Sequence, residues 1–378
     1  MKQIFHSPFN EDAKVKPIWK QYYELIKLFF SLNYLPAEYY LFKFDDKNCG
    51  EKDMLQYLPY SWFLREVNNE FTKNSWKSLF KNKYEFEIYA AGKGLKVPKS
   101  YGIYNKLYGF DFDDNSSLSN LSELEGFLKR RKLEKIVFKD LCGKQGQHIH
   151  FVSDILFSQK ETTLIIDNQR ISLKDFIKEL GNGEFLVQEQ LENDEFLNSI
   201  YPNSLNTFRI ITYYSTKQPA KILGALLRTG IGENKVDNWH RGGLIIPIKL
   251  STGCFTDYGY DYHYNVYTSH PDTQFIFRET KIPYWEEITS IVINATKAFP
   301  MMKFVAWDIA LTTRGYYILE ANAGQINIFV NQLSGNGIAG IIREDLKEYG
   351  CMFPEKKIPP VTIDKITQRL MQVIKNIF

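Results

Sequence analysis

The chain has 378 residues, of which 44% are hydrophobic and 24% charged, and its formal net charge is +3. This composition is typical of a globular protein with two or three domains, and the near-balanced charge argues against a nucleic-acid-binding protein, which needs a strongly basic face. The four cysteines are widely spaced and form no CxxC pair, which argues against a disulfide framework or a zinc site. The first thirty residues mix lysines with apolar residues and show neither a signal peptide nor a membrane span, so we expect a cytoplasmic protein.

Residues 1–80 are expected to form a helical N-terminal domain. From Pro17 onward, large apolar side chains recur at three- and four-residue steps, as an amphipathic helix requires. The first of these positions are Trp19, Tyr22, Tyr23, Ile26 and Phe30. This segment carries no obvious chemistry, and we expect it to contact a second substrate or a partner.

The middle of the chain alternates between helical and extended patterns. Helices are expected over 86–91, 122–132 and 173–180, and strands over 135–139, 148–151 and 185–189. The first two strands are separated by a glycine-punctuated turn, which predicts a hairpin.

The second half is expected to contain strands over 208–214, 222–227 and 244–248, and helices over 288–298, 338–348 and 363–378. Between residues 253 and 273 the sequence is rich in Tyr, Asp and His, which predicts a long surface loop or irregular insert. Two further strands, within 307–310 and 317–324, are joined by a turn at 313–315.

These last two strands carry three oxygen-bearing side chains among apolar residues. Glu320 and Asn322 are two positions apart and therefore point to the same face of a strand, where Asp308 from the neighbouring strand can join them. Burying a carboxylate is costly unless something neutralises it. Two carboxylates and an amide make a hard oxygen site suited to Mg²⁺ carrying the phosphates of a nucleotide. The alternative is that the acidic side chains simply meet solvent or a nearby lysine.

A candidate phosphate site follows the strand 135–139. Lys139 lies at the end of this strand, before a turn that contains Gly143 and Gly146, whose backbone N–H groups can approach phosphate oxygens closely. An ordinary tight turn is the commoner explanation of such glycines.

The end of the strand 185–189 is a candidate site for a nucleotide base. Gln188 and Glu189 could read the amino group of adenine through the strand edge and a carboxylate. Asp194 and Glu195 follow, and either could meet the hydroxyls of a ribose; solvated loop charges are the alternative for both.

Two arginines lie where planar oxyanions could bind. Arg209 enters a strand just after Asn206, and Arg228 ends a strand before a glycine. Structural salt bridges are the alternative for both arginines. The polar, glycine-ended loop 237–243, which includes Arg241, has the character of a mobile flap over a site.

Taken in chain order, these parts resemble the ATP-grasp superfamily, and more narrowly the ATP-grasp proteins associated with sugar transfer, which are encoded in bacterial capsule and other surface-polysaccharide loci. The resemblance covers about residues 81–345. Its most specific parts are the Asp…Glu-x-Asn pattern that starts at Asp308 and the Asn-Thr-x-Arg stretch that starts at Asn206.

The resemblance implies an α+β ATP-grasp fold, in which two α+β subdomains clamp ATP between their sheets. Beside the helical N-terminal domain, it implies an N-terminal subdomain with a glycine-hairpin lid over 81–187. A C-terminal subdomain with the Mg²⁺ site would occupy 188–346, followed by a helical tail over 347–378.

The resemblance also implies roles for the residues at matching positions. The residues that map to Mg²⁺ ligands are Asp308, Glu320 and Asn322. Those that map to the nucleotide are Lys83, Lys139, Gly143 and Gly146 at the phosphates, Gln188, Glu189 and Leu191 at the adenine hinge, and Glu195 or its neighbour Asp194 at the ribose. The candidate catalytic residues are Asn206, Arg209, Arg228 and Arg241, with Arg209 and Arg228 where the transferred phosphoryl group and the acceptor carboxylate would sit. Asn193 departs from the family, which often has His at this position.

The implied reaction is carboxylate–amine ligation. ATP phosphorylates a carboxylate to give an acyl phosphate and ADP, and an amine then attacks to give an amide and phosphate. We expect the carboxylate or the amine to belong to a sugar. Two alternatives are a sugar or small-molecule kinase on the same fold, and a non-catalytic component that binds a nucleotide or a glycan.

Overall fold

The computed structural model describes residues 8–9, 14–68, 75–143, 148–215, 217–323 and 326–375. The chain forms two compact units. Unit 1 contains Met1–Lys77, Ser199–Asp308 and Asn322–Phe378, and unit 2 contains Ser78–Asn198 and Ile309–Ala321. The domain boundaries expected from the sequence stay a prediction. Within the described ranges, every helix is too short or too polar to cross a bilayer.

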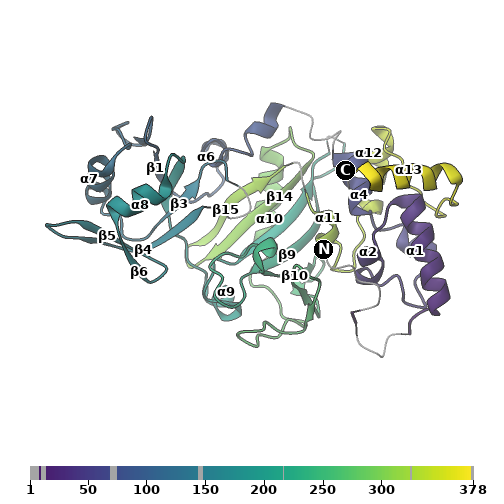
Figure 1. Ribbon diagram of the computed structural model, residues 1–378. Coiled ribbons are helices and arrows are strands. Elements are labelled where there is room, and N and C mark those ends of the chain that lie inside the picture. Colours follow the sequence, from purple (N-terminus) through teal and green to yellow (C-terminus); the bar gives the residue numbers. More distant parts are fainter. Residues whose placement is uncertain are drawn as a thin grey trace. The chain divides into compact units, whose positions relative to one another are not determined.

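An antiparallel sheet forms the centre of unit 1 (Figure 1). The strand order is β13-β12-β10-β9-β8-β14-β15, and β11 also pairs with β10. The strands are β8 Thr207–Tyr213, β9 Lys221–Thr229, β10 Leu244–Lys249, β11 Cys254–Phe255, β12 Gly259–Tyr260, β13 Val266–Tyr267, β14 Phe304–Thr312 and β15 Gly315–Asn322. All nine residues of β14 are buried, as a central strand requires, and the hairpin of β14 and β15 contributes to both units.

Helix α10 (Trp285–Ala298) covers one face of this sheet. The indole Nε1 of Trp307 donates to Thr212 Oγ1 at 2.9 Å, and Thr296 Oγ1 of α10 donates to the same oxygen at 2.8 Å. Because successive strand residues point to opposite faces, Asp308 points away from α10. The face that carries Asp308 also carries Ala306 and Phe304, which pack into an apolar core of unit 1.

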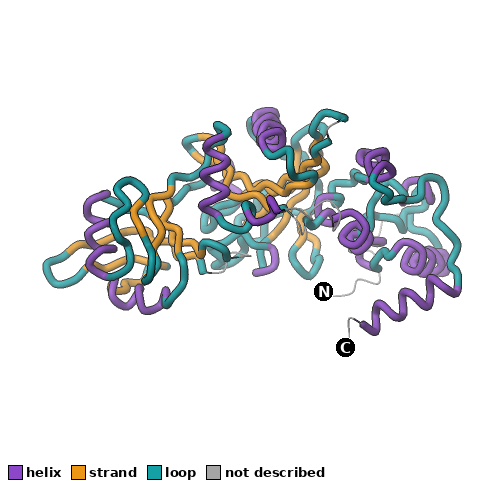
Figure 2. Tube along the Cα trace, turned by 90° about the horizontal axis from the view of Figure 1, so that it is seen from above, coloured by secondary structure: helices purple, strands orange, loops and turns teal. Residues whose placement is uncertain are grey.

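A helical layer packs against the sheet in unit 1 (Figure 2). Its core joins Leu28, Tyr40 and Phe63 to strand residues such as Phe304, whose ring lies 5.3 Å from that of Phe63. The helices are α1 Ile18–Leu32, α2 Pro36–Leu41, α3 Glu51–Met54, α4 Tyr60–Trp62, the π-helix η1 Phe63–Asn68, α11 Ile328–Asn331, α12 Ala339–Glu348 and α13 Ile363–Lys375. Two 3₁₀ turns, η2 (Ser75–Ser78) and η3 (Trp239–Arg241), and the short α9 (Glu195–Ile200) complete the connections.

Unit 2 contains an antiparallel sheet of seven strands in the order β2-β1-β7-β3-β4-β5-β6. Its strands are β1 Ser100–Tyr104, β2 Phe110–Asp111, β3 Ile136–Asp140, β4 Ile149–Phe157, β5 Thr162–Ile166, β6 Gln169–Ser172 and β7 Phe185–Glu189. Helices α7 (Leu121–Arg131) and α8 (Leu173–Leu180) bury apolar side chains against one face, which includes Phe138 and Val187. The other face carries a smaller apolar cluster of Ile103, Leu141 and Leu186, packed by Tyr84 of α6 (Lys83–Gly92).

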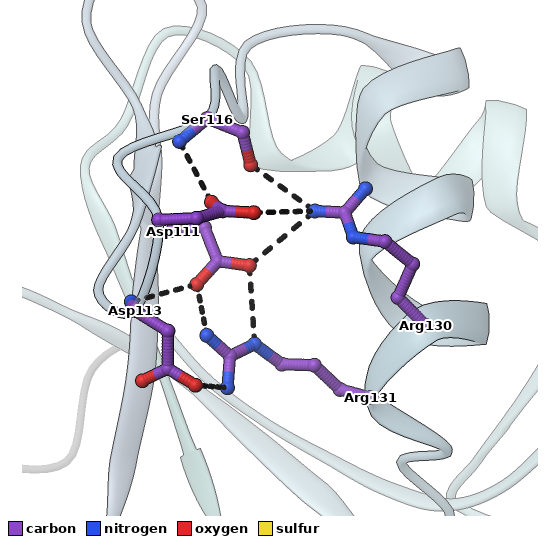
Figure 3. A network of polar contacts seen from close by, with 6 residues as sticks. Asp111, Asp113, Ser116, Arg130 and Arg131 are labelled. Atoms are coloured by element: carbon purple, nitrogen blue, oxygen red, sulfur yellow. Dashed lines mark hydrogen bonds and ion pairs between the residues drawn. The ribbon is translucent and has the colours of Figure 1, made fainter.

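A buried carboxylate fixes the end of α7 to the edge of this sheet (Figure 3). Asp111 of β2 accepts from Arg131, whose Nε lies 3.1 Å from Oδ2, and from Arg130 at 3.4 Å. Burial raises the pKa of Asp111, but the hydrogen bonds from Arg131 and from the backbone N–H of Asp113, together with the charge of Arg131, lower it overall. The network therefore holds Asp111 ionised and serves the fold.

The observed elements confirm the mixed helix-and-strand prediction, with helix α1 inside the expected N-terminal helical segment. Two features differ from expectation. The insert 253–273 contains three two-residue strands, β11 to β13, and β4 continues to Phe157, where it pairs with the unpredicted β5. These strands form because they pair with neighbouring strands, which a local sequence pattern does not reveal.

Candidate functional site

Three neighbouring strands of unit 1 bring two arginines onto one carboxylate. Arg209 of β8 donates through Nε to Asp308 Oδ1, and its Nη2 lies 2.7 Å from Oδ2. Arg228 of β9 adds a third contact, with Nη2 3.1 Å from Oδ2 of Asp308. The side chain of Asp308 is 1% exposed, against 23% for Arg209 and 15% for Arg228. The arginines therefore neutralise the buried carboxylate, and part of each arginine side chain stays accessible to solvent. We call Arg209, Arg228 and Asp308 the arginine cluster.

A threonine and a second carboxylate fix the orientation of Arg228. Thr207 pairs with Arg228 across β8 and β9, and its Oγ1 accepts from Nε at 3.1 Å and from Nη2 at 2.8 Å. The same hydroxyl donates to Asp237, whose Oδ2 lies 3.4 Å from Nη2 of Arg228. The guanidinium of Arg228 is thus held in one plane. The pKa of His240 is lowered, first by burial and then by the positive charges of Arg209 and Arg228.

In unit 2 a lysine is held by a neutral amide. Residue Gln188 of β7 lies opposite Ser100 of β1 and Val137 of β3, so that Lys139, two positions further along β3, shares its face. Lys139 Nζ donates to Oε1 of Gln188 at 2.6 Å, and Nε2 of Gln188 donates to Glu87 of α6 and, at 3.2 Å, to Ser100 Oγ. The hydroxyl of Ser100 donates to the other oxygen of Glu87. We call Glu87, Ser100, Lys139 and Gln188 the lysine cluster.

Burial shifts both ionisable groups of the lysine cluster toward their neutral forms. The pKa of Glu87 is raised to about 7 by burial, against the opposing hydrogen bonds from Ser100 and Gln188 and the charge of Lys139. The pKa of Lys139 is lowered by burial, while Glu87 and Glu320 oppose the shift and Lys83 adds to it. An anion beside Lys139 would restore its charge.

Lys83 lies at the first turn of α6, where it fixes the segment after β3. Its Nζ donates to the backbone oxygens of Asp140 and Gly143, at 2.8 Å each. A side chain at Gly143 would place its Cβ 2.7 Å from Asp140 Cβ, so glycine suits this close approach. Gly146 lies outside the described residues. The phosphate roles of Lys83, Gly143 and Gly146 stay predictions.

The residues after β7 form a connected segment of unit 2. Glu189 accepts from the backbone N of Lys99 and from Arg314 Nη2, at 2.8 Å each, and Leu191 is buried. Asp194 caps α9, with Oδ1 2.9 Å from the backbone N of Leu197, whereas Glu195 is exposed. Capping occupies the Asp194 side chain, so of the two ribose candidates Glu195 has the freer one.

The three expected metal ligands lie on two adjacent strands. Glu320 and Asn322 share one face of β15, since both are partly exposed and Ala321 between them is buried. Asp308 lies on β14 in the arginine cluster. Two carboxylates and an amide oxygen fit a hard divalent cation. No group of three or more His, Cys, Asp or Glu side chains suited to a metal occurs among the residues described, so a site here needs the amide.

The two other expected catalytic residues are Asn206 and Arg241. Asn206 is fully buried; its amide donates to the backbone oxygen of Tyr201 at 2.8 Å and accepts from Ser204 Oγ at 3.0 Å. It therefore shapes the loop that leads into β8. Arg241 is exposed on η3, and its backbone oxygen accepts from Asn234.

Glu87 and Ser100 are the members of the lysine cluster that the sequence analysis missed, and Glu87 is the ionisable one. The expected helix 86–91 gave it no special position, because a lone acidic residue in a helix usually faces solvent. The usable signal is its helical spacing. Ala90 follows three residues later and so lies on the same side of α6, and both Ala90 and the adjacent Phe86 are buried.

Three solved structures illustrate what the fold is similar to. The ATP-grasp ligase PsnB, complexed with minimal precursor, Mg and ADP, is 15% identical with a TM-score of 0.39, and the match covers 74% of this chain and 61% of that one. The ADP complex of the N5-carboxyaminoimidazole ribonucleotide synthetase purK is 10% identical, with a TM-score of 0.40 over 75% and 55% of the chains. The L-amino acid ligase from Bacillus licheniformis is 14% identical, with a TM-score of 0.38 over 75% and 52%. The chain thus spans less than two thirds of the length of each of these three proteins.

The family model gives the assignment. No curated protein matches the chain. Residues 64–344, which include both clusters and the strands β14 and β15, match the model of the sugar-transfer associated ATP-grasp family. This range is most of the chain, and the chain therefore belongs to that family.

Proposed function

We propose that the protein is an ATP-dependent carboxylate–amine ligase that forms an amide through an acyl phosphate. Membership of an ATP-grasp family supports the use of ATP. The observation that carries the proposal is the arginine cluster, in which one buried carboxylate holds two guanidinium groups on adjacent strands. Such a pair suits a reaction in which negative charge moves from a phosphoryl group to an acyl oxygen.

In this proposal, the arginines bind the two reacting oxyanions. A guanidinium offers parallel N–H donors that match carboxylate and phosphate oxygens, and Asp308 with Thr207 fixes the planes of both groups. Arg209 and Arg228 would orient the acceptor carboxylate and stabilise the transferred phosphoryl oxygens. They would then stabilise the tetrahedral oxyanion formed when the amine attacks.

The lysine cluster would bind the phosphates of ATP. Gln188 holds Lys139 through a neutral oxygen, so the positive charge of the ammonium is not cancelled by its direct hydrogen-bond partner. A triphosphate next to this group would restore the lysine pKa that burial has lowered. Lys83, which fixes the neighbouring turn, is proposed as the second phosphate lysine.

We propose Asp308, Glu320 and Asn322 as the residues that hold Mg²⁺. When bound there, the ion would neutralise charge on the nucleotide phosphates. Asp308 already accepts from two arginines, so its role as a ligand requires that it share its oxygens with them. Asp237 offers Arg228 another carboxylate at 3.4 Å.

The substrates are proposed to be sugar-linked, in agreement with the family description, and the product to be a modified capsule or other surface polysaccharide made in the cytoplasm. A uronic acid could supply the carboxylate and an amino sugar the amine. Both fit a chemistry that needs oxyanion binding and no covalent protein intermediate.

The test is a screen for ADP release in which sugar acids are paired with amines in the presence of Mg²⁺. We expect ADP formation that needs both partners, with a product whose mass equals acid plus amine minus water. A phosphorylated sugar that accumulates without an amine would instead identify a kinase. Tight binding of Mg-ATP by calorimetry with no ADP over the whole panel would identify a non-catalytic component.

A further inference from the structure

Helix α1 of unit 1 exposes an apolar face. Five large side chains on this face are between 52% and 69% exposed, and we call them the α1 apolar face: Ile18, Trp19, Tyr22, Tyr23 and Ile26. At 100° per residue these positions fall within one stripe of the helix. Single exposed apolar residues are common, but a continuous stripe of this kind marks an interaction surface.

The orientation of α1 is fixed by polar contacts on its opposite side. The side chain of Gln21 is buried and donates to the backbone oxygen of Lys16 at 2.7 Å. Glu24 accepts from Lys16 at 2.9 Å and from the hydroxyl of Tyr39 at 2.7 Å. Together with Leu28 and Leu32, which are buried in the core, these bonds fix the inner side of the helix against unit 1, so the α1 apolar face is directed outward.

Basic residues are concentrated around this helix. Residues 14–32 contain four lysines and one glutamate, with Lys16 buried and paired with Glu24, and residues 354–375 contain five basic and two acidic residues. Together these two segments carry a formal charge of +6 in a chain whose total is +3, so the other residues carry −3. The carboxylate of Glu51, which also lies beside α1, is paired with Lys27 at 2.5 Å.

The two basic segments lie side by side. Ser31 of α1 donates to the backbone oxygen of Pro359 at 2.7 Å, and the backbone N of Ile358 donates to Glu51 at 3.0 Å. Helix α13 crosses the C-terminal end of α1, with the guanidinium of Arg369 4.5 Å from the ring centre of Phe29 (Figure 1). The exposed Lys356 and Lys357 directly precede this contact.

We propose that the α1 apolar face and its surrounding lysines dock unit 1 on the surface of an anionic membrane. Trp and Tyr rings favour the interface between headgroups and acyl chains, and lysines beside them favour anionic lipid. A helix of 15 residues is roughly 22 Å long and would lie in the plane of the surface. The contact is peripheral and needs no spanning segment.

Charge argues against a second copy of the chain as the occupant. A two-fold contact through the α1 apolar face would place the basic segments of both copies next to each other. Like charges across an interface are unfavourable, whereas an anionic lipid surface complements them.

The test is binding of the full chain to vesicles. We expect the protein to sediment with vesicles of phosphatidylcholine mixed with phosphatidylglycerol at least about tenfold more strongly than with phosphatidylcholine alone, and to be released by high salt. Trp19 should report the contact by a blue shift of its emission, which the variant Trp19→Phe should lose. Absence of binding, or equal binding to both vesicles, would overturn the proposal.

A matched pair of triple variants tests whether binding depends on the α1 apolar face or on exposed apolar side chains in general. Ile18→Ser, Tyr22→Ser and Ile26→Ser together should weaken binding at least about tenfold. Leu107→Ser, Ile276→Ser and Tyr284→Ser remove similar exposed side chains elsewhere and should leave binding unchanged. An equal loss in both variants would refute the assignment. So would a dimer in sedimentation velocity that the α1 triple variant converts to a monomer.

Discussion

The two clusters stabilise a buried charge in opposite ways. In the arginine cluster, Asp308 is 1% exposed and is compensated by two guanidinium groups in direct contact. In the lysine cluster, Lys139 contacts only the neutral oxygen of Gln188 among the hydrogen bonds described for its ammonium, and the carboxylate of Glu87 lies on the far side of that amide.

The contacts in the arginine cluster fix side-chain geometry, whereas the contacts in the lysine cluster also leave the charge of the lysine uncancelled. Direct ion pairs fix the directions of Arg209 and Arg228, but they also cancel charge. An amide between Lys139 and Glu87 fixes the position of the lysine while leaving its charge for another anion. The proposed division of roles follows: the arginines orient reacting oxygens, and the lysine binds phosphate.

Replacing Asp308 should have the largest effect. Asp308→Asn leaves two arginines without their shared counter-charge, which costs about 3–5 kcal/mol for a fully buried pair and less here because the arginines are partly exposed. With the guanidinium groups no longer oriented, ADP formation should fall by at least about 10². The rate of ADP release and the unfolding temperature would be measured together. Asp237→Asn, which leaves both Asp308 contacts in place, should lose less, and normal turnover in Asp308→Asn would eliminate the proposed role.

Lys139→Met should weaken nucleotide binding without unfolding the protein. A hydrogen bond to a charged group contributes about 1.5–3 kcal/mol, so the Kd for ATP should rise roughly 10- to 100-fold. Isothermal titration calorimetry would measure it. The control is Lys135→Met, just before the same strand, where the lysine is exposed and paired with Glu192. Equal effects of the two changes would contradict the assignment of Lys139 to the phosphates.

Glu87→Gln should change how stability depends on pH. Burial raises the pKa of Glu87 to about 7, so the folded state holds a proton that the unfolded state releases near pH 4.5. Its contribution to stability is therefore complete below about pH 4.5 and is lost as the pH rises through about 7. The variant removes that loss and should raise the unfolding temperature at pH 8 by roughly 2–5 °C, with a flatter profile from pH 4.5 to 7.

Two controls apply to the Glu87 experiment. Glu85→Gln, at an exposed position of the same helix, should leave the profile unchanged. Some slope should remain in Glu87→Gln, because burial also raises the pKa of Glu38 in unit 1 to about 7. A profile in Glu87→Gln that matches the parent protein would show that the buried carboxyl is not linked to folding.

Arg314→Ala should have the smallest effect. Its pair with Glu189 at 2.8 Å has the same chemistry as the arginine cluster, but the Arg314 side chain is 55% exposed. Exposed pairs contribute up to about 1 kcal/mol, so thermal unfolding should shift by no more than about 2–3 °C. A shift as large as that of Asp308→Asn would remove burial as the reason for the difference between these ion pairs.

The sequence predicted most of the strands that carry the clusters, because their apolar runs and alternation are local. It singled out Arg209, Arg228 and Asp308 one by one, and the structure shows that they contact each other. It left open what neutralises Asp308, since a strand pattern reports a costly carboxylate but not its partner. Glu87 was missed because its contact with Gln188 joins a helix to a strand about a hundred residues later. The cap formed by Asp194 likewise depends on where α9 begins.

The hairpin of β14 and β15 has a consequence for synthesis on the ribosome. Ile309–Ala321 belong to unit 2, but residues 199–308 of unit 1 are made between them and the rest of unit 2. At ordinary rates of translation this interval is on the order of ten seconds. The seven-stranded sheet of unit 2 is therefore made well before the segment Ile309–Ala321 that completes the unit, and a nascent chain stalled before Ile309 would lack a finished version of either unit.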